Sequence, residues 1–262
     1  NRWPSLSFDA GSVNDLASPL LSAGFYYKTF MWPRAAWKSL YEPKIREAAG
    51  LGVAPDLADP DHYSARYAHC DVLVVGGGVA GLAAAFAAAE TGASVILCDE
   101  QADLGGALRY EKGATVDGQP GWEWAQAAVA KLAAKDNVRL LTRTTGFGYY
   151  AQNFVGLVER LTDHLAQPLP DQPRERLWQV RAKRVVLATG AIERHMVFGD
   201  NDRPGIMLAS AARAYLNHYG VAVGKKIGVF TANDSAYWAA ADLKKAGVDV
   251  AAIVDKIGRA HV

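Results

Sequence analysis

The sequence is poor in cysteine and has no long apolar run. Its 262 residues include two cysteines, Cys70 and Cys98, which are too few for a disulfide framework and form no C-x-x-C pair. A dithiol redox centre is therefore excluded. The longest apolar run, residues 79–89, is shorter than the roughly 20 residues that cross a bilayer. We expect a protein of the reducing cytoplasm without a membrane partner.

The sequence also lacks an excess of charge of either sign. It has 28 Lys and Arg against 27 Asp and Glu, a net charge of +1. This balance gives no reason to expect a nucleic acid as partner. No second cluster at ligand spacing accompanies His69 and Cys70, so we expect no metal site. The hydrophobic share of 50% is typical of a globular protein.

Glycine is abundant in the most informative stretch, residues 71–85, which reads DVLVVGGGVAGLAAA. It predicts a buried strand, a glycine turn and the start of a helix. Gly76, Gly78 and Gly81 have the G-x-G-x-x-G spacing. In this pattern the first glycine permits a tight turn, the second lets the backbone approach a pyrophosphate, and the third lets the helix pack close to the strand. The helix N-terminus favours an anion there, so the stretch predicts a dinucleotide site.

An acid at the end of the next predicted strand, residues 94–98, supports this interpretation. Asp99 follows Gly81 by 18 positions, near the offset of a carboxylate that holds a ribose 2′-hydroxyl. Glu100 stays the alternative, because the register at a strand end is uncertain by one residue. A carboxylate there would repel a 2′-phosphate. The sequence therefore predicts NAD or FAD as the ligand, and not NADP.

The rest of the chain predicts an α/β organisation. Residues 1–69 are expected to be an extended, aromatic-rich arm and linker with a short helix at 41–49, and residues 70–256 to be the dinucleotide-binding domain. Within that domain the pattern predicts helices and strands at 122–135, 137–142, 177–182, 184–187 and 206–218. A second βαβ unit is predicted at about 224–256, with strand 226–230, helix 235–246 and strand 248–254.

The turn of the second unit, residues 231–237, contains no glycine after its strand. Side chains there would crowd a pyrophosphate, and Asp234 would place negative charge beside it. We interpret this unit as a degenerate βαβ that kept its shape and lost or altered its nucleotide site. A unit that served only for packing is the alternative.

Together these parts resemble the two-dinucleotide-binding flavoprotein fold, a Rossmann-type FAD/NAD(P)-binding superfamily. In that fold a glycine pair follows the acid, and a Thr-Gly turn comes back towards the cofactor. Here Gly105, Gly106, Thr189 and Gly190 match, and we expect them to bind the cofactor. More specifically, several stretches resemble the α subunits of heterotetrameric sarcosine oxidases, namely residues 1–5, 25–33, 147–150, 188–194 and 201–207.

This resemblance implies that the chain is the NAD-binding middle of a longer α subunit, truncated at both ends. The enzyme would oxidatively demethylate sarcosine to glycine with flavin, O2 and tetrahydrofolate. NAD would bind this chain, with FAD as the alternative at the same site. FAD and FMN would lie on or near a partner β subunit, and γ and δ subunits would complete the heterotetramer.

Substrate oxidation is then expected on the β subunit, so no catalytic residue is expected on this chain. Residues 257–262 do not follow the family and are expected to be a non-native tail. Two other functions stay open. The chain could be a subunit of a related flavin-dependent amine or opine oxidase or dehydrogenase, or a nucleotide-binding scaffold without catalysis.

Overall fold

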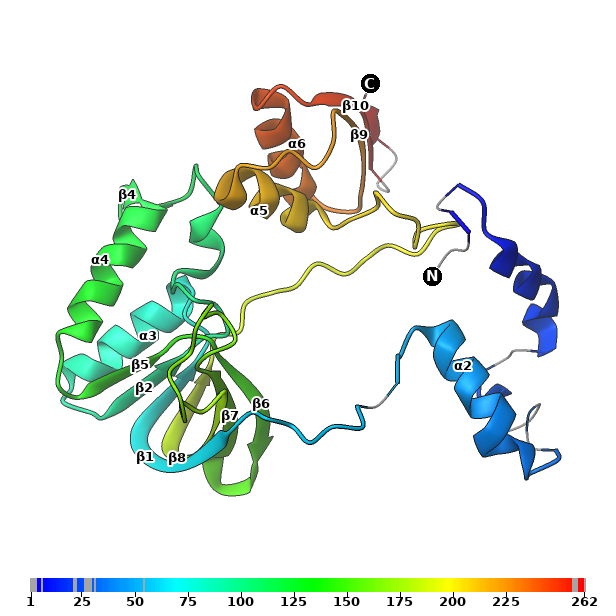
Figure 1. Ribbon diagram of the computed structural model, residues 1–262. Coiled ribbons are helices and arrows are strands. Elements are labelled where there is room, and N and C mark those ends of the chain that lie inside the picture. The colour runs from blue at the N-terminus through cyan, green and yellow to red at the C-terminus, as the bar shows by residue number, and fades with distance from the viewer. Residues whose placement is uncertain are drawn as a thin grey trace. The chain divides into compact units, whose positions relative to one another are not determined.

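The computed structural model describes residues 4–5, 7–20, 23–25, 30, 32–53, 55–255 and 259–261. The chain divides into two compact units, Asn1–Pro60 and Asp61–Val262 (Figure 1). The first unit contains the 3-10 helix η1 (Ala10–Leu20), the π-helical turn η2 (Trp37–Tyr41) and helix α2 (Glu42–Ala49). Helix α2 coincides with the predicted helix at 41–49. Much of the aromatic stretch 25–33 lies outside the described residues.

The second unit is built on a six-stranded sheet with the order β5-β2-β1-β8-β7-β6. The strands β5, β2, β1 and β8 run parallel, and β7 and β6 run antiparallel to their neighbours. The bounds of these strands are β1 (Tyr63–Val75), β2 (Val95–Cys98), β5 (Val138–Leu141), β6 (Thr144–Tyr150), β7 (Phe154–Arg160) and β8 (Glu175–Leu187). Both β1 and β8 contain 13 residues, and β8 joins the two parts of the sheet because it pairs parallel with β1 and antiparallel with β7.

Three features of this sheet differ from the sequence prediction. The strands predicted at 177–182 and 184–187 form one strand, β8. Strand β1 begins at Tyr63, inside the segment expected to be arm and linker. Strands β6 and β7 had not been expected, because glycines interrupt their hydrophobic alternation. One of these glycines, Gly156, lies under the ring of Phe147, which a Cβ at that position would overlap.

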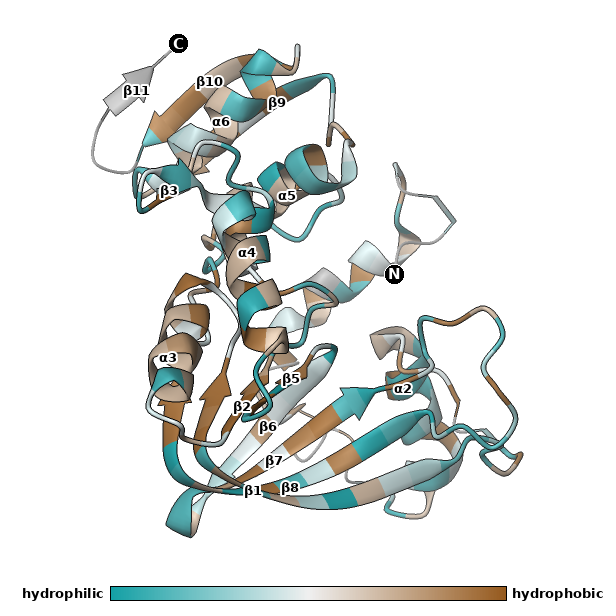
Figure 2. Ribbon diagram, turned by 90° about the vertical axis from the view of Figure 1, so that its left-hand side faces the viewer, coloured by the Kyte–Doolittle hydropathy of each residue, from teal (hydrophilic) through white to brown (hydrophobic). Residues whose placement is uncertain are grey.

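Two hydrophobic cores lie on the two faces of the parallel strands. One lies between them and the antiparallel strands, and it includes Leu73, Leu157 and Trp178. The other lies beneath helices α3 (Val79–Glu90) and α4 (Gly121–Ala133), which cover the opposite face (Figure 1). Figure 2 shows the apolar colour along the strands that α3 covers. Burying one leucine of such a core contributes about 1.5–3 kcal/mol.

Helix α3 packs closely against the sheet because most of the residues on its buried face have small side chains. Its buried residues, Gly81, Leu82, Ala85 and Ala89, recur at helical spacing. The alanines and the glycine let the helix axis approach β1 and β2. The connection from β2 to α4 contains η3 (Gly106–Arg109) and a short hairpin, β3 (Thr115–Val116) and β4 (Gln119–Pro120), and the turn between β6 and β7 contains η4 (Ala151–Asn153).

The second βαβ unit has the expected order of elements. Strands β9 (Lys226–Thr231) and β10 (Asp249–Asp255) are parallel and joined by helix α6 (Ser235–Lys245), with α5 (Ala209–Tyr219) packed beside α6. Within the predicted non-native tail, β11 (Arg259–His261) pairs antiparallel with β10. Residues 257, 258 and 262 of that tail lie outside the described part. No helix among the described residues has the length and apolarity needed to span a membrane.

Candidate functional site

The glycine turn joins β1 to α3 at the carboxyl end of the parallel strands. Gly76 has φ +104°, a conformation that side chains disfavour, and its N–H donates to the carbonyl of Cys98 at 2.8 Å. A Cβ on Gly76 would overlap the carbonyl oxygen of Ala188, and a Cβ on Gly81 would overlap the carbonyl oxygen of Gly76. Packing of the turn therefore requires glycine at both positions.

Gly78 stands in a different environment. It is the N-cap residue of α3 with an extended backbone, and a Cβ there would meet only the Cα of Gly106, at 3.9 Å. This distance is ordinary van der Waals contact, so protein packing does not demand glycine at this position. No side chain caps α3, and its first turn carries no acid. The N–H groups at the head of the helix are available to an anion.

The Asp99 carboxylate lies against the glycine turn. Its Oδ2 accepts the N–H of Gly77 at 2.6 Å, and its Oδ1 accepts the N–H of Gln101 at 2.8 Å. Each carboxylate oxygen keeps a second lone pair, so a ribose hydroxyl could still donate to it. Glu100 is exposed, and its backbone carbonyl accepts from Arg160 at 2.7 Å. Of the two candidate acids, Asp99 is the one whose side chain contacts the turn.

The second glycine pair also borders the turn. The N–H of Gly105 donates to the carbonyl of Gly77 at 2.8 Å, and a Cβ on Gly106 would lie 3.0 Å from the Cα of Gly78. Gly105 has φ +127°, and a Cβ there would approach the ring of Trp122 at 2.8 Å. The structure thus brings Gly76, Gly78, Gly81, Asp99, Gly105 and Gly106 together.

The Thr-Gly turn follows β8 on the other side of Gly76. Ala188 lies between the end of β8 and this turn, and its N–H donates to the carbonyl of Val75 at 2.8 Å. A Cβ on Gly76 would lie 3.1 Å from the backbone nitrogen of Thr189. Thr189 and Gly190 are both exposed, so the turn brings their backbone to the rim of the site and leaves it open to a ligand.

Sequence reasoning did not single out Gln101, Arg109 or His218 at this site. Arg109 Nη1 donates to Gln101 Oε1 at 3.1 Å, and Nη2 lies 2.9 Å from His218 Nε2. His218 follows Arg109 by 109 residues, so no local pattern connects the two. The position of Arg109, three residues after Gly106, is the one signal in the sequence that could have suggested it.

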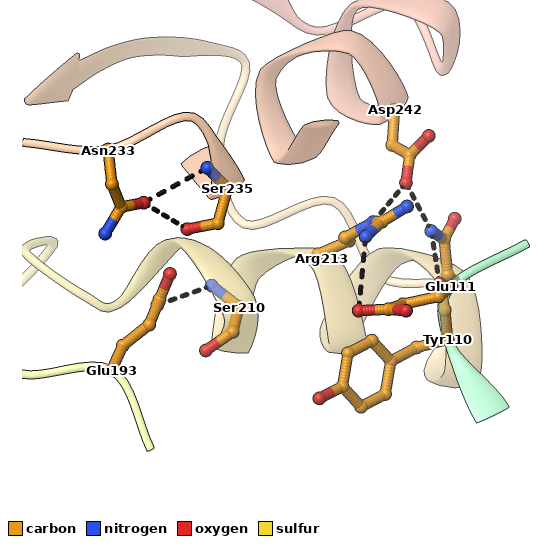
Figure 3. Close-up of polar contacts among 9 residues, drawn as sticks. Tyr110, Glu111, Glu193, Ser210, Arg213, Asn233, Ser235 and Asp242 are labelled. Atoms are coloured by element: carbon orange, nitrogen blue, oxygen red, sulfur yellow. Dashed lines mark hydrogen bonds and ion pairs between the residues drawn. The ribbon is translucent and has the colours of Figure 1, made fainter. Parts of the chain in front are cut away.

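The turn of the second βαβ unit is filled by its own side chains. Asn233 Oδ1 accepts the N–H of Ser235 at 3.1 Å and the Ser235 hydroxyl at 2.5 Å (Figure 3). The Thr231 hydroxyl donates to the carbonyl of Asn233 at 2.7 Å and accepts its N–H at 3.1 Å. The Asn233 side chain thus accepts the first backbone N–H of α6, although the N-cap residue itself, Asp234, makes no side-chain cap bond.

A polar cluster attaches the second βαβ unit and α5 to residues 110–111, which follow η3. Arg213 of α5 pairs with Asp242 of α6 at 2.6 Å and with Glu111 at 3.7 Å (Figure 3). Asn217 donates to the carbonyl of Tyr110 and to Asp242, both at 2.8 Å. Burial raises the pKa of the Tyr110 hydroxyl above its ordinary value. The cluster fixes α5 and α6 beside the segment that follows η3.

Neither cysteine has the properties of a reactive thiol. Burial raises the pKa of Cys98 to about 12 and that of Cys70 to about 11. The thiolate is the nucleophile and the metal ligand, so both side chains behave as small hydrophobic groups. No group of three or more His, Cys, Asp or Glu side chains suited to a metal ion occurs in the part of the chain that the structure describes.

Comparison with known proteins agrees with this geometry. Residues 71–188, from β1 to the end of β8, match the family model "FAD dependent oxidoreductase". The solved structure of L-proline dehydrogenase from P. horikoshii has a TM-score of 0.56 and 27% identity, over 76% of this chain and 37% of that one. These likenesses confirm the predicted flavoprotein-like dinucleotide-binding fold.

Two curated relatives show how specific the likeness is. The α subunit of sarcosine oxidase from Rhizobium meliloti is 54% identical over 255 residues, which is 97% of this chain and 26% of that protein. One of the opine oxidase subunits of Agrobacterium tumefaciens is 28% identical, over 78% of this chain and 39% of that protein. The chain thus spans about a quarter of the first relative, and the opine oxidase alternative is not favoured.

Proposed function

We propose that this chain, which is homologous to about a quarter of the sarcosine oxidase α subunits, is the dinucleotide-binding part of such a protein. The identity of 54% over 97% of the chain carries the proposal. Because it extends far beyond the glycine motif, it is more specific than the flavoprotein fold alone. The resemblance expected from the sequence is confirmed by this match.

The complete enzyme would oxidatively demethylate sarcosine to glycine with flavin, O2 and tetrahydrofolate in the cytoplasm. The name of the relative, which is one subunit of an oxidase, supports a multi-subunit enzyme. We propose that β, γ and δ subunits are the partners, with FAD and FMN on or near the β subunit. This chain would supply no catalytic residue, and its two buried thiols are consistent with that role.

For the site itself, we propose that the turn Gly76–Gly81 receives the two phosphates of NAD. The N–H groups at the head of α3 would donate to the phosphate oxygens, and Asp99 would accept from a ribose hydroxyl. Gly105, Gly106, Thr189 and Gly190 would form the walls, and Glu100 is the alternative ribose acid. The space beside Gly78, where packing does not require glycine, supports this assignment. FAD is the alternative ligand of the same site, and a bound flavin would add redox chemistry.

Extraction of the nucleotides from the purified complete complex tests the proposal. Mass spectrometry should find about one NAD per complex in addition to the flavins. The Gly78→Val variant should lose NAD, because a branched side chain would occupy the phosphate position, while its flavin content stays unchanged. Loss of FAD in the variant would assign FAD to this site. If wild type and variant contain the same nucleotides, the turn binds none and the chain is a scaffold.

Turnover of the wild-type complex tests the substrate. We expect sarcosine oxidation to exceed the oxidation of opines and other secondary amines at equal concentration. A preference for an opine would contradict the proposed substrate without affecting the nucleotide site.

A further inference from the structure

Arg109, the last residue of η3, forms no ion pair with a carboxylate among the residues that the structure describes. The residue is half-buried, and its Nε is buried without an acceptor among the described residues. Its other nitrogens contact Gln101 Oε1 at 3.1 Å and His218 Nε2 at 2.9 Å. Within the described part of the chain, no Asp or Glu oxygen lies within ion-pair distance of this guanidinium.

Neither side chain that contacts Arg109 is a carboxylate. A guanidinium has donors and no acceptor. A hydrogen bond from Arg109 to His218 therefore requires Nε2 to accept, with the ring proton on Nδ1. The Gln101 side chain is an amide. Burial of a cation that has no anionic partner and one unused donor costs free energy, and a bound anion would offset this cost.

The contacts of Arg109 lead directly to the glycine turn. Gln101, which accepts from Arg109, donates its own N–H to Asp99 Oδ1 at 2.8 Å. Asp99 Oδ2 in turn accepts the N–H of Gly77 at 2.6 Å. On the other side, η3 begins at Gly106, which packs against Gly78. Arg109 is thus connected through Gln101 to the segment of the predicted ribose acid and, as part of η3, to the glycine pair beside Gly78.

We propose that Arg109 is a phosphate-binding residue of the dinucleotide site, oriented by Gln101 and His218. This inference rests on the proposed function, since it requires a dinucleotide at the turn. A guanidinium binds phosphate oxygens through two parallel hydrogen bonds, and it adds a full charge to the partial charge of the helix N-terminus. Gln101 and His218 are positioning residues, because they act through Arg109.

Arg160 is a matched control. Its Nε is also buried without an acceptor among the described residues. Its charge, however, is neutralised in part by Asp163, at 3.6 Å from Nη1, and its Nη2 donates to the carbonyl of Glu100 at 2.7 Å. Both arginines therefore have an unused donor, and of the two only Arg109 has no ion pair among the described residues.

The test uses the complete complex after removal of bound nucleotide, titrated calorimetrically with NAD and, in parallel, with FAD. Arg109→Ala should lower the affinity about 10- to 100-fold, the scale of hydrogen bonds to a charged group. Arg109→Lys, which keeps the charge and loses the planar fork, should lie between wild type and Arg109→Ala. Arg160→Ala should bind within about twofold of wild type.

Salt dependence separates phosphate binding from a structural role. Raising the ionic strength should weaken nucleotide binding less in Arg109→Ala than in wild type, because one charged contact is missing. Arg109→Gln, which keeps a donor for His218 and removes the charge, should show the same reduced dependence if Arg109→Ala does not fold.

The outcomes distinguish this inference from the function on which it rests. If wild type binds neither NAD nor FAD, the proposed function fails. If wild type binds one of them and the neutral Arg109 variants bind it with unchanged affinity and salt dependence, only the role of Arg109 is overturned. A lower melting temperature with unchanged affinity would also overturn it, since Arg109 would then serve only to connect η3 with α5.

Discussion

The two strand–turn–helix units of the domain share the order of their elements and differ in the conformation of the turn, because the residue before the helix is extended at Gly78 and right-handed helical at Asp234. The first turn, between β1 and α3, has glycines and no side-chain cap. In the second, between β9 and α6, Asn233 accepts from the backbone and hydroxyl of Ser235, and Thr231 bonds to Asn233. A turn that satisfies its own donors leaves fewer of them for a phosphate.

The difference also separates packing from ligand binding within the first turn. Gly76 and Gly81 have no room for a side chain, because the carbonyl oxygens of Ala188 and Gly76 occupy that space. Gly78 has room for one. Packing therefore requires glycine at Gly76 and Gly81 and leaves Gly78 free for the proposed ligand contact. The turn of the second βαβ unit contains no glycine and has a different conformation, with Asp234 right-handed helical where Gly78 is extended.

The largest effect is expected for Gly81→Ala. The added methyl group would overlap the Gly76 carbonyl, so α3 must move away from β1. We expect a loss of roughly 4 kcal/mol or more of unfolding free energy, in the range of severe packing defects. Urea unfolding of the complete protein measures it. Gly228→Ala in β9, where a Cβ meets nothing within 4 Å, is the control and should change stability little. Equal stability of both variants would refute the packing role.

Gly78→Ala is expected to reduce stability less than Gly81→Ala does and to act mainly on dinucleotide binding. The protein accommodates the methyl group, since its nearest neighbour would be 3.9 Å away. Stability should fall by about 1 kcal/mol at most, because alanine is a poorer N-cap residue than glycine. Calorimetric titration should show loss of dinucleotide affinity by at least about tenfold. Unchanged affinity would mean that the phosphates lie elsewhere.

Asp99→Ala should weaken dinucleotide binding by about 1.5–3 kcal/mol, the scale of hydrogen bonds to a charged group. The variant also loses the contact to the Gly77 N–H, so a modest loss of stability accompanies it. Glu100→Ala is the matched control, and its affinity should equal that of wild type. The opposite pattern in the two titrations would identify Glu100 as the ribose acid.

The smallest effect is expected in the second turn. Asn233→Ala removes the acceptor for Ser235 and should cost about 0.5–1.5 kcal/mol of stability, the usual net contribution of a hydrogen bond. Nucleotide content and affinity should not change, because this turn is proposed to bind none. A change in bound nucleotide would show that the second unit retained a ligand site.

The sequence predicted much of the site because its determinants are local. The spacing of Gly76, Gly78 and Gly81 and the acid after β2 follow from contacts within one βαβ unit. The helices at α3, α4, α5 and α6 were predicted to within a few residues, since their apolar spacing is regular. The cofactor-binding role of the three glycines and of Asp99 stays a prediction.

Features that depend on distant partners could not be predicted. Strand β8 is continuous because β1 and β7 pair along it, although its polar residues divide it into two segments in the sequence. Strands β6 and β7 contain glycines that look like turn residues until Phe147 is placed over Gly156. The contact of Arg109 with His218 joins residues that are 109 positions apart.

The sequence by itself determined that a strand, a glycine turn and a helix would form, because steric freedom and helix periodicity act over a few residues, and the phosphate-binding role of the turn stays a prediction. Only the tertiary structure decided which acid reaches the turn, which glycines packing demands, and which arginine contacts Gln101 and His218 without an ion pair among the described residues. Those properties depend on what the fold places next to each side chain, and the order of residues does not specify that directly.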